Sequence, residues 1–565
     1  MRIRLLSLAI ILVGLILVLR LYFIQVVHGD DFASDASRQH INKNTVLYDR
    51  GSIYFNPKSG EESWAAISRS GFTVAINPSI IKDPVPLFNA LSSILPINKE
   101  EFLAKASKEN GEYREIVTHI NKETADKVKA LNLYGITVAV DKKRFYPAGR
   151  TASHTIGFVG YDGDKLIGKY GLERSYEDTL KKDPNSAYSN FFAEFFINVK
   201  ETFSDSQGQS GDIYTSLEPS VQLFVEAELE NVMKTWNSDG AGAVVMDPMN
   251  GEIISLAWMP SFDPNDLSEE TIEKFKNPIV EGVYEMGSII KPISMASGLD
   301  SGTVTATSTY YDNGFLVLNS KRISNYDGRG RGLATMQNVL NQSLNTGVAY
   351  VAMKMGNKKF SEYMYSFGLG TETGIDLPNE TKGLVKNLDS KRDIEMATAS
   401  YGQGIALTPI ATVRALSVLA NGGVLVVPHI VKKIVYDNGL SKKISFAPGK
   451  QVISKATSDE ITRMLVNVVD TSLRDGKAKI PGYSVAAKTG TAQMTDEGVA
   501  GYADGKYLHS FFGYFPAYKP RFLVFLFHTH PKGVRYASET LTDPFLNITK
   551  FLLNYYQIPP DRPDQ

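Results

Sequence analysis

The C-terminal part of the chain contains four apolar runs that pair around turn-forming residues. Runs at 241–246 and 251–258 flank the segment 247–251, whose Asp, Pro, Asn and Gly residues are typical of a tight turn. Runs at 510–515 and 522–527 flank a second turn, which has a proline at each end. Each pair of runs is therefore predicted to form a β-hairpin.

Between these hairpins and before them the periodicity is helical. Residues 220–236 repeat apolar side chains at intervals of three and four residues, which marks one face of a helix. Residues 335–355 and 458–470 are also predicted to be helical. Hairpin, helices and hairpin together predict an α/β (α+β) domain in which helices flank a central antiparallel sheet.

Residues 40 to about 215 have a mixed pattern. Short apolar runs at 73–76 and 136–140 predict strands, and the charged, periodic segment 99–131 predicts helices. Residues 201–212 are rich in Ser, Gln, Gly and Asp, so they are the best candidate for a linker. We therefore expect a mixed α/β region that is separate from the C-terminal domain.

The N-terminus carries a long apolar segment. Residues 5–27 contain Ser7 and Arg20 among otherwise apolar or weakly polar side chains, and about 23 residues of helix span roughly 34 Å, enough to cross a bilayer. Arg2 and Arg4 favour a cytoplasmic N-terminus. A cleavable signal peptide is the alternative, but the nearest small-x-small site, 34–36, lies well beyond the apolar run. We expect a single-pass membrane anchor, with the remaining chain on the extracytoplasmic side.

Composition narrows the possible functions. The 565 residues allow two to four folded units, and 60 basic against 61 acidic side chains give a net charge of −1. This balance removes the electrostatic argument for nucleic-acid binding. The chain has no cysteine, which excludes disulfides, thiolate metal sites and cysteine nucleophiles.

Two segments contain Ser-x-x-Lys, a spacing that brings a hydroxyl and an amine to one face of a helix. A serine needs an adjacent base to become a nucleophile, and a lysine can be that base if its pKa falls. Ser288 and Lys291 follow a glycine and open a helical run, whereas Ser79 and Lys82 lie between prolines in a segment predicted to be an extended loop. Ser288 is therefore the candidate nucleophile, with a solvated helix start as the alternative.

Two further motifs carry polar groups suited to a substrate. Ser343 and Asn345 form Ser-x-Asn, which by itself is also typical of a helix cap or turn. Lys488-Thr489-Gly490-Thr491 follows a strand-like segment, where glycine permits close approach of a substrate backbone and the cation and hydroxyls suit a carboxylate. The alternative for this motif is a turn with an exposed lysine.

In this order the three motifs are the signature set of penicillin-binding proteins and class A β-lactamases. Behind a membrane anchor, the chain resembles the monofunctional class B penicillin-binding proteins, with Met286 where the family has proline before Gly-Ser. Further segments resemble family landmarks in the catalytic domain and in the N-terminal pedestal: 260–265, 373–378, 400–404, 408–409, 49–54, 144–147, 154–157 and 171–173.

This resemblance implies a peptidoglycan D,D-transpeptidase that works through a serine acyl-enzyme and is acylated by β-lactams. Its donor would be a D-Ala-D-Ala stem peptide and its acceptor an amine of a second stem. No metal or cofactor is implied. The implied roles are nucleophile for Ser288, base for Lys291, proton relay for Ser343, amide binding for Asn345, carboxylate binding for Lys488, Thr489 and Thr491, and an oxyanion hole from the backbone N–H groups of Ser288 and Thr491, with Gly490 lining the substrate strand.

The resemblance also implies four parts of the chain: a cytoplasmic stub and anchor at 1–27, an elongated pedestal (dimerisation-like) domain at 28–212, the transpeptidase domain at 213–557 and a tail at 558–565. Because no glycosyltransferase domain fits before the transpeptidase, glycan polymerisation would come from a SEDS-type polymerase, among other membrane proteins of the divisome or elongasome. A septal role in cell division is slightly favoured over elongation.

Three alternatives remain from sequence: a D,D-carboxypeptidase, in which water resolves the acyl-enzyme, a β-lactamase-type hydrolase, and a non-catalytic scaffold or β-lactam sensor. The large pedestal and the anchor argue against a β-lactamase, and the intact motifs argue against a scaffold.

The histidines do not indicate a further functional site. His528 and His530 have no third ligand, so a strand surface is favoured over a metal pair, and His154 is expected to be a structural hydrogen-bonding group.

Overall fold

The computed structural model describes residues 49–107, 114–163, 165–182, 209–268, 270–495 and 501–563, with three isolated positions before residue 49. The chain divides into two compact units. The smaller comprises residues 1–50, 68–144 and 181–208, and the larger comprises 51–67, 145–180 and 209–565. The larger unit thus collects three separate stretches of chain, and the predicted boundary at residue 212 stays a prediction.

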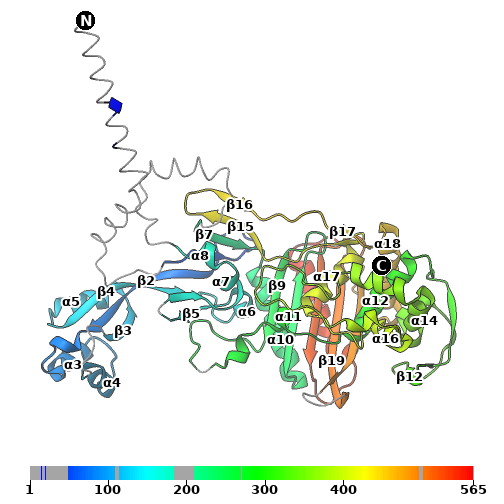
Figure 1. The fold of residues 1–565 in the computed structure, drawn as a ribbon, viewed down its shortest axis with the longest axis horizontal. Helices are drawn as coiled ribbons and strands as arrows, with labels where there is room; N and C mark the ends of the chain where they lie inside the picture. The colour runs from blue at the N-terminus through cyan, green and yellow to red at the C-terminus, as the bar shows by residue number, and fades with distance from the viewer. Residues whose placement is uncertain are drawn as a thin grey trace, which may run out of the picture. The chain divides into compact units, whose positions relative to one another are not determined.

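The centre of the larger unit is a five-stranded antiparallel sheet in the order β18-β19-β20-β8-β9. Both predicted hairpins are confirmed, and they lie side by side: the green strands of the first border the orange to red strands of the last (Figure 1). All eight residues of β20 are buried because both faces of the sheet are covered. The strands are β8 (Gly240–Met246), β9 (Ile253–Met259), β18 (Ala486–Thr495), β19 (Tyr502–Phe515) and β20 (Phe522–Thr529).

Each face of this sheet has its own helical cover and its own apolar core. On one face α10 (Pro219–Trp236) and α20 (Thr542–Tyr555) pack against the strands, and α10 is the helix predicted from the stripe at 220–236. The other face packs against a layer of helices in which α12, whose first residue is Lys291, is in contact with α14, α17 and α18. These helices are α12 (Lys291–Asp300), α14 (Asn345–Met355), α17 (Pro409–Ala420) and α18 (Lys455–Asn467).

The helix predicted over 335–355 is interrupted. It consists of α13 (Met336–Asn341) and α14, and the residues between them leave the helical conformation, with Ser343 at a left-handed φ of 54°. The helix predicted at 458–470 is α18, which continues into a wider turn, η7 (Val468–Ser472). Both departures fall beside the candidate site, where local geometry overrides helical propensity.

A second sheet in the larger unit joins the early segments of the chain to late ones. Strand β1 (Ile53–Tyr54) runs parallel to β7 (Gly211–Thr215), which pairs in turn with β15 (Val431–Tyr436). On the other side β1 pairs with the start of β2 (Trp64–Ile76). Residues 51–67 are therefore held by strands that follow them by more than 140 residues.

The smaller unit has a separate core around the end of β2. There β2 pairs with β3 (Arg114–Ile120) and β4 (Ile136–Phe145), which confirms the predicted strands at 73–76 and 136–140. The prediction of helices over the whole of 99–131 is wrong, because β3 lies between two helices and its half-buried residues complete the sheet. The helices are α3 (Pro84–Ser92), α4 (Lys99–Ala106) and α5 (Lys122–Ala130).

Apart from the three isolated positions, the predicted membrane anchor at 1–27 lies outside the described residues, as does most of the predicted linker at 201–212. Among the helices of the described ranges, none has both the length and the apolar character needed to cross a membrane.

Candidate active site

The nucleophile candidate lies on a short 3-10 turn, η5 (Gly287–Ile290), that leads directly into α12. Gly287 has a φ of 63°, and a Cβ there would come within 2.6 Å of the Thr491 carbonyl oxygen. Only glycine combines this left-handed conformation with so close an approach of β18. Ser288 is partly exposed while its neighbours Gly287 and Ile289 are buried, so it is the side chain that this turn presents to the pocket.

Lys291, one turn after Ser288, is completely buried. Its Nζ donates to Ser343 Oγ at 3.0 Å and to the Ser343 carbonyl oxygen at 2.5 Å. Burial and, secondarily, the nearby Lys488 ammonium hold the pKa of Lys291 well below its usual value. A neutral amine has two N–H groups and one lone pair. Since Ser343 accepts from both N–H groups, the lone pair of the neutral amine is free to accept a proton.

The Ser-x-Asn motif occupies the break between α13 and α14. Asn345 is the first residue of α14 and its Nδ2 donates to the Ser324 carbonyl oxygen at 2.8 Å. The next residue, Thr346, is held by a buried carboxylate. Its hydroxyl donates to Asp312 Oδ1 at 2.8 Å, and the same oxygen accepts from Asn325. A buried, fully bonded carboxylate thus holds the break that places Ser343.

The Lys-Thr-Gly motif lies on β18, at the edge of the central sheet. Lys488 is buried, which lowers its pKa to about 7, and its Nζ donates to the Thr489 carbonyl oxygen at 3.0 Å. A Cβ on Gly490 would overlap Ser510 Oγ and lie 2.7 Å from the Met286 carbonyl oxygen. Ser510 uses this space to donate to Met286 at 2.9 Å. Gly490 therefore lets β18 and β19 lie directly against the turn that carries Ser288.

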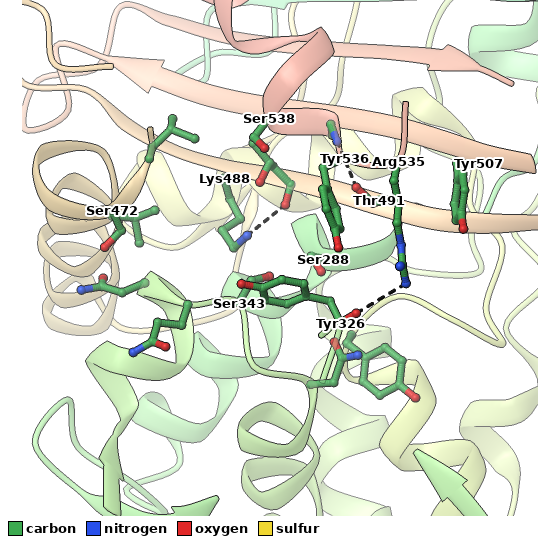
Figure 2. A pocket seen from close by; sticks show the side chains of 18 of the residues that line it. Ser288, Tyr326, Ser343, Ser472, Lys488, Thr491, Tyr507, Arg535, Tyr536 and Ser538 are labelled. Carbon is green, nitrogen blue, oxygen red and sulfur yellow. Dashed lines mark hydrogen bonds between the residues drawn. The ribbon is translucent and has the colours of Figure 1, made fainter. Parts of the chain in front are cut away.

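These groups surround one pocket of about 480 Å³. Figure 2 shows Ser288 and Ser343 facing the space below β18, with Lys488 above them. Of the predicted site residues, Ser288, Ser343, Asn345, Lys488, Thr489 and Thr491 line the pocket. Lys291 and Gly490 do not line it; they lie behind its wall, against Ser343 and Ser510 respectively.

Sequence reasoning missed several residues of the pocket wall. Tyr401 and Gln403 lie within the landmark at 400–404, which the sequence marked without giving it a role. This loop contacts the nucleophile turn, since Gly287 N donates to the Gly402 carbonyl oxygen at 3.1 Å. Nothing in the sequence pattern pointed to the aromatic and basic side chains at the other end of the pocket, labelled in Figure 2: Tyr326, Tyr507, Arg535 and Tyr536.

The other candidate groups in the sequence, Ser79 and the histidines, do not form a comparable site in the described residues. Ser79 is exposed on the 3-10 turn η2 (Pro78–Ile80) rather than in an extended loop, and its hydroxyl donates to Asn77 Oδ1 at 2.5 Å. The strand-surface interpretation of His528 is wrong: the side chain is fully buried under α19 (Ala537–Thr540), while His530 lies past the strand end. In the described part of the chain no three His, Asp or Glu side chains are grouped as metal ligands. His154 is the expected structural group, bonded at 3.0 Å to the Lys274 carbonyl oxygen.

Two family models match the chain. Residues 241–550 match the penicillin binding protein transpeptidase domain, and residues 49–211 match the penicillin-binding protein dimerisation domain. Stage V sporulation protein D of Bacillus subtilis is 32% identical over 95% of this chain and 82% of its own length. The peptidoglycan D,D-transpeptidase FtsI of Escherichia coli is 27% identical over 96% of this chain and 90% of its own.

Solved structures agree in fold. Penicillin binding protein 2X of Streptococcus thermophilus superposes with a TM-score of 0.73 at 20% identity, covering 91% of this chain and 80% of that one. Penicillin binding protein 3 of Mycobacterium tuberculosis, in complex with aztreonam, superposes with a TM-score of 0.68 at 22% identity, covering 92% of this chain and 98% of that one. The mixed α/β architecture is thus that of penicillin-binding proteins.

Proposed function

The chain belongs to the class B penicillin-binding proteins, and on that premise we propose that it is a peptidoglycan D,D-transpeptidase in which Ser288 forms the acyl-enzyme. One observation carries the assignment of residues: the Ser-x-x-Lys, Ser-x-Asn and Lys-Thr-Gly segments come from three separate parts of the chain and converge on one pocket. The alternative interpretations of these motifs, as a solvated helix start, a helix cap and a turn with an exposed lysine, do not predict that they converge.

In the proposed acylation, Ser288 Oγ attacks the carbonyl of the penultimate D-Ala. The neutral Lys291 amine accepts the Ser288 proton through its free lone pair. The tetrahedral oxyanion is stabilised by the backbone N–H groups of Ser288 and Thr491, and losing one such donor typically costs about 10²–10³ in rate. When the intermediate collapses, the proton passes through Ser343 to the leaving amine, and the terminal D-Ala departs.

The remaining residues orient the donor peptide. Thr489 and Thr491 offer hydroxyls, and Lys488 a charge, to the terminal carboxylate, while Asn345 lies where the peptide amide would run. An amine of a second stem then attacks the ester and releases Ser288. A D,D-carboxypeptidase would use water at this step. The pedestal match and the names of the full-length relatives favour the transpeptidase.

Intact mass spectrometry of the full-length chain with a penicillin tests this assignment. We expect a stable adduct of one penicillin in the native chain and none in Ser288→Ala. Ser79→Ala, which changes the serine of the second Ser-x-x-Lys, is the matched control and should be labelled like the native chain. An adduct lost within minutes would indicate a hydrolase, and none on folded native protein would contradict the enzyme.

We also propose a location and partners. The apolar segment at 1–27 would anchor the chain in the bacterial cytoplasmic membrane with the catalytic domain outside, beside a SEDS-type glycan polymerase and other divisome proteins. The hydropathy of this segment and the division transpeptidases among the relatives support the proposal. Full-length protein should stay with membranes after an alkaline wash, whereas protein lacking 1–27 should not. Release of both would contradict the anchor.

A further inference from the structure

Two buried histidines form a cross-strand pair behind the substrate strand. His509 on β19 lies directly opposite His528 on β20, and both side chains are inaccessible to solvent. Their rings meet edge to face with centroids 5.2 Å apart. His509 is also the partner of Thr491 in the β18–β19 register, so the pair lies on the face opposite to Gly490 and Ser510.

The shortest hydrogen bonds of this pair follow one consistent order. Burial lowers the pKa of His509 to about 4 and that of His528 to about 3, so both rings are neutral near pH 7. A carbonyl oxygen can only accept, so His509 Nε2 donates to Arg535 at 3.0 Å. His509 Nδ1 then accepts from the Thr540 hydroxyl at 2.9 Å.

The same reasoning continues to the next strand. The Thr540 hydroxyl also lies 3.4 Å from the Ala537 carbonyl oxygen, but its single proton makes the shorter bond to His509, so its oxygen accepts from His528 Nε2 at 3.0 Å. His528 Nδ1 in turn accepts from the Ser238 hydroxyl at 2.7 Å. The chain of bonds therefore runs in one direction from Ser238 to the Arg535 carbonyl, and both histidines carry their proton on Nε2.

This series of hydrogen bonds ends at the wall of the active-site pocket. Arg535, Tyr536 and Ala537 all line the pocket, and Ala537 N donates to Thr491 Oγ1 at 3.1 Å. A hydroxyl that accepts from a backbone N–H points its own proton elsewhere. Thr491 can then direct its proton to an anion in the pocket, which Figure 2 shows bordered by Thr491, Tyr536 and Arg535.

We propose that His509, Thr540 and His528 are positioning residues that fix residues 535–537 against β18, so that the Thr491 hydroxyl is oriented to donate to the carboxylate of the substrate. The network touches neither Ser288 nor Lys291 and acts through Ala537. This inference rests on the proposed function, because it assigns the carboxylate-binding role of Thr491 to an oriented hydroxyl.

Thr540→Val tests the network by removing its central hydroxyl at nearly constant volume. We expect the acylation rate constant with a penicillin to fall about tenfold, since a hydrogen bond to a charged group is weakened. The change with the methyl ester of the same penicillin, which lacks the carboxylate, should stay within about twofold. Thr540→Ser retains the hydroxyl and should restore the native preference for the acid.

Thr549→Val is the matched control. Thr549 is fully buried on α20 and its hydroxyl has no hydrogen-bond partner among the described residues, so its loss probes burial alone. Equal effects of the two Thr→Val changes, or an equal fall with the acid and the ester, would overturn the proposal.

A second measurement does not depend on activity or on a variant that folds. Nitrogen NMR of ¹⁵N-histidine-labelled full-length chain should show His509 and His528 both protonated on Nε2 and unprotonated on Nδ1. The opposite tautomer on either ring would overturn the derived bond order. If the native chain forms no penicillin adduct, the proposed function fails while this spectrum still tests the network.

Discussion

In the proposed mechanism, the site can react only while the buried Lys291 amine is neutral. The amine of Lys291 is held by the hydroxyl and carbonyl oxygens of Ser343, and no carboxylate of the described residues forms an ion pair with it. Two cations buried close together disfavour each other, so Lys488 helps to keep Lys291 neutral while its own pKa, about 7, leaves it partly charged near neutral pH. In the proposed mechanism, Lys488 would therefore both bind the substrate carboxylate and lower the pKa of the base Lys291.

Replacing Lys488 should consequently shift the pH dependence of acylation. In Lys488→Gln the nearby positive charge is gone, so the pKa of Lys291 rises and the acid limb of the acylation rate moves to higher pH. Lys488→Arg keeps a cation and is the control; its limb should stay near the native position. Both variants lose substrate contacts, so the position of the limb is the readout. A limb that does not move in Lys488→Gln would show that Lys488 does not tune the base.

At the scale of elements, the site depends on how closely the nucleophile turn approaches β18. Gly287 lies against the backbone of Thr491 and Gly490 lies against the Met286 carbonyl oxygen, so each lacks a Cβ where the other segment's backbone passes. Two short motifs far apart in the sequence are therefore coupled by packing as well as by chemistry.

Gly287→Ala should separate the turn from β18 and slow acylation by at least tenfold, because the Ser288 N–H leaves the oxyanion position. Gly302→Ala is the matched control: its φ of 68° is similar, but a Cβ there would meet nothing within 4 Å. Both changes should cost about 1–2 kcal/mol of stability from the left-handed conformation. Acylation kinetics beside thermal unfolding would separate the two effects, and equal acylation by both variants would contradict the packing argument.

This dependence on packing explains what the sequence could predict. Hairpins and amphipathic helices follow from local patterns, and Ser288 and Lys488 belong to ordered motifs with a known chemistry. The break at Ser343 did not follow, because it is imposed by the buried Asp312 network rather than by propensity. Nor did Arg535 and Tyr536, which reach the pocket because the segment carrying them folds back over β19.

At the scale of the whole molecule, the two compact units have separate cores. The core of the smaller unit includes Val74, Leu91 and Phe102, and none of these residues belongs to the clusters around the central sheet. Stability and catalysis can therefore be perturbed separately.

Phe102 is 2% exposed, and Phe102→Ala should destabilise the smaller unit by about 3–5 kcal/mol while the acylation rate stays within twofold. Calorimetry of the full-length chain should show a lower midpoint temperature for one unfolding transition. This should not be the transition whose midpoint temperature rises when a penicillin is bound. Phe360→Ala, at a fully buried position of the larger unit, should lower that other transition. A tenfold loss of acylation in Phe102→Ala would contradict this separation.

The order of strands in the central sheet also has a consequence for synthesis. Strand β8 can pair with β20 only after β20 has been synthesised. Strand β20 follows β8 by about 280 residues, or roughly 15 to 55 seconds at ordinary rates of translation. In that interval one edge of β8 has no neighbour, and unpaired edges invite association with other chains. The emerging polypeptide also carries Ser288 before it carries β18, so a chain that stops short of residue 486 has its nucleophile but none of the strand that would present a substrate to it.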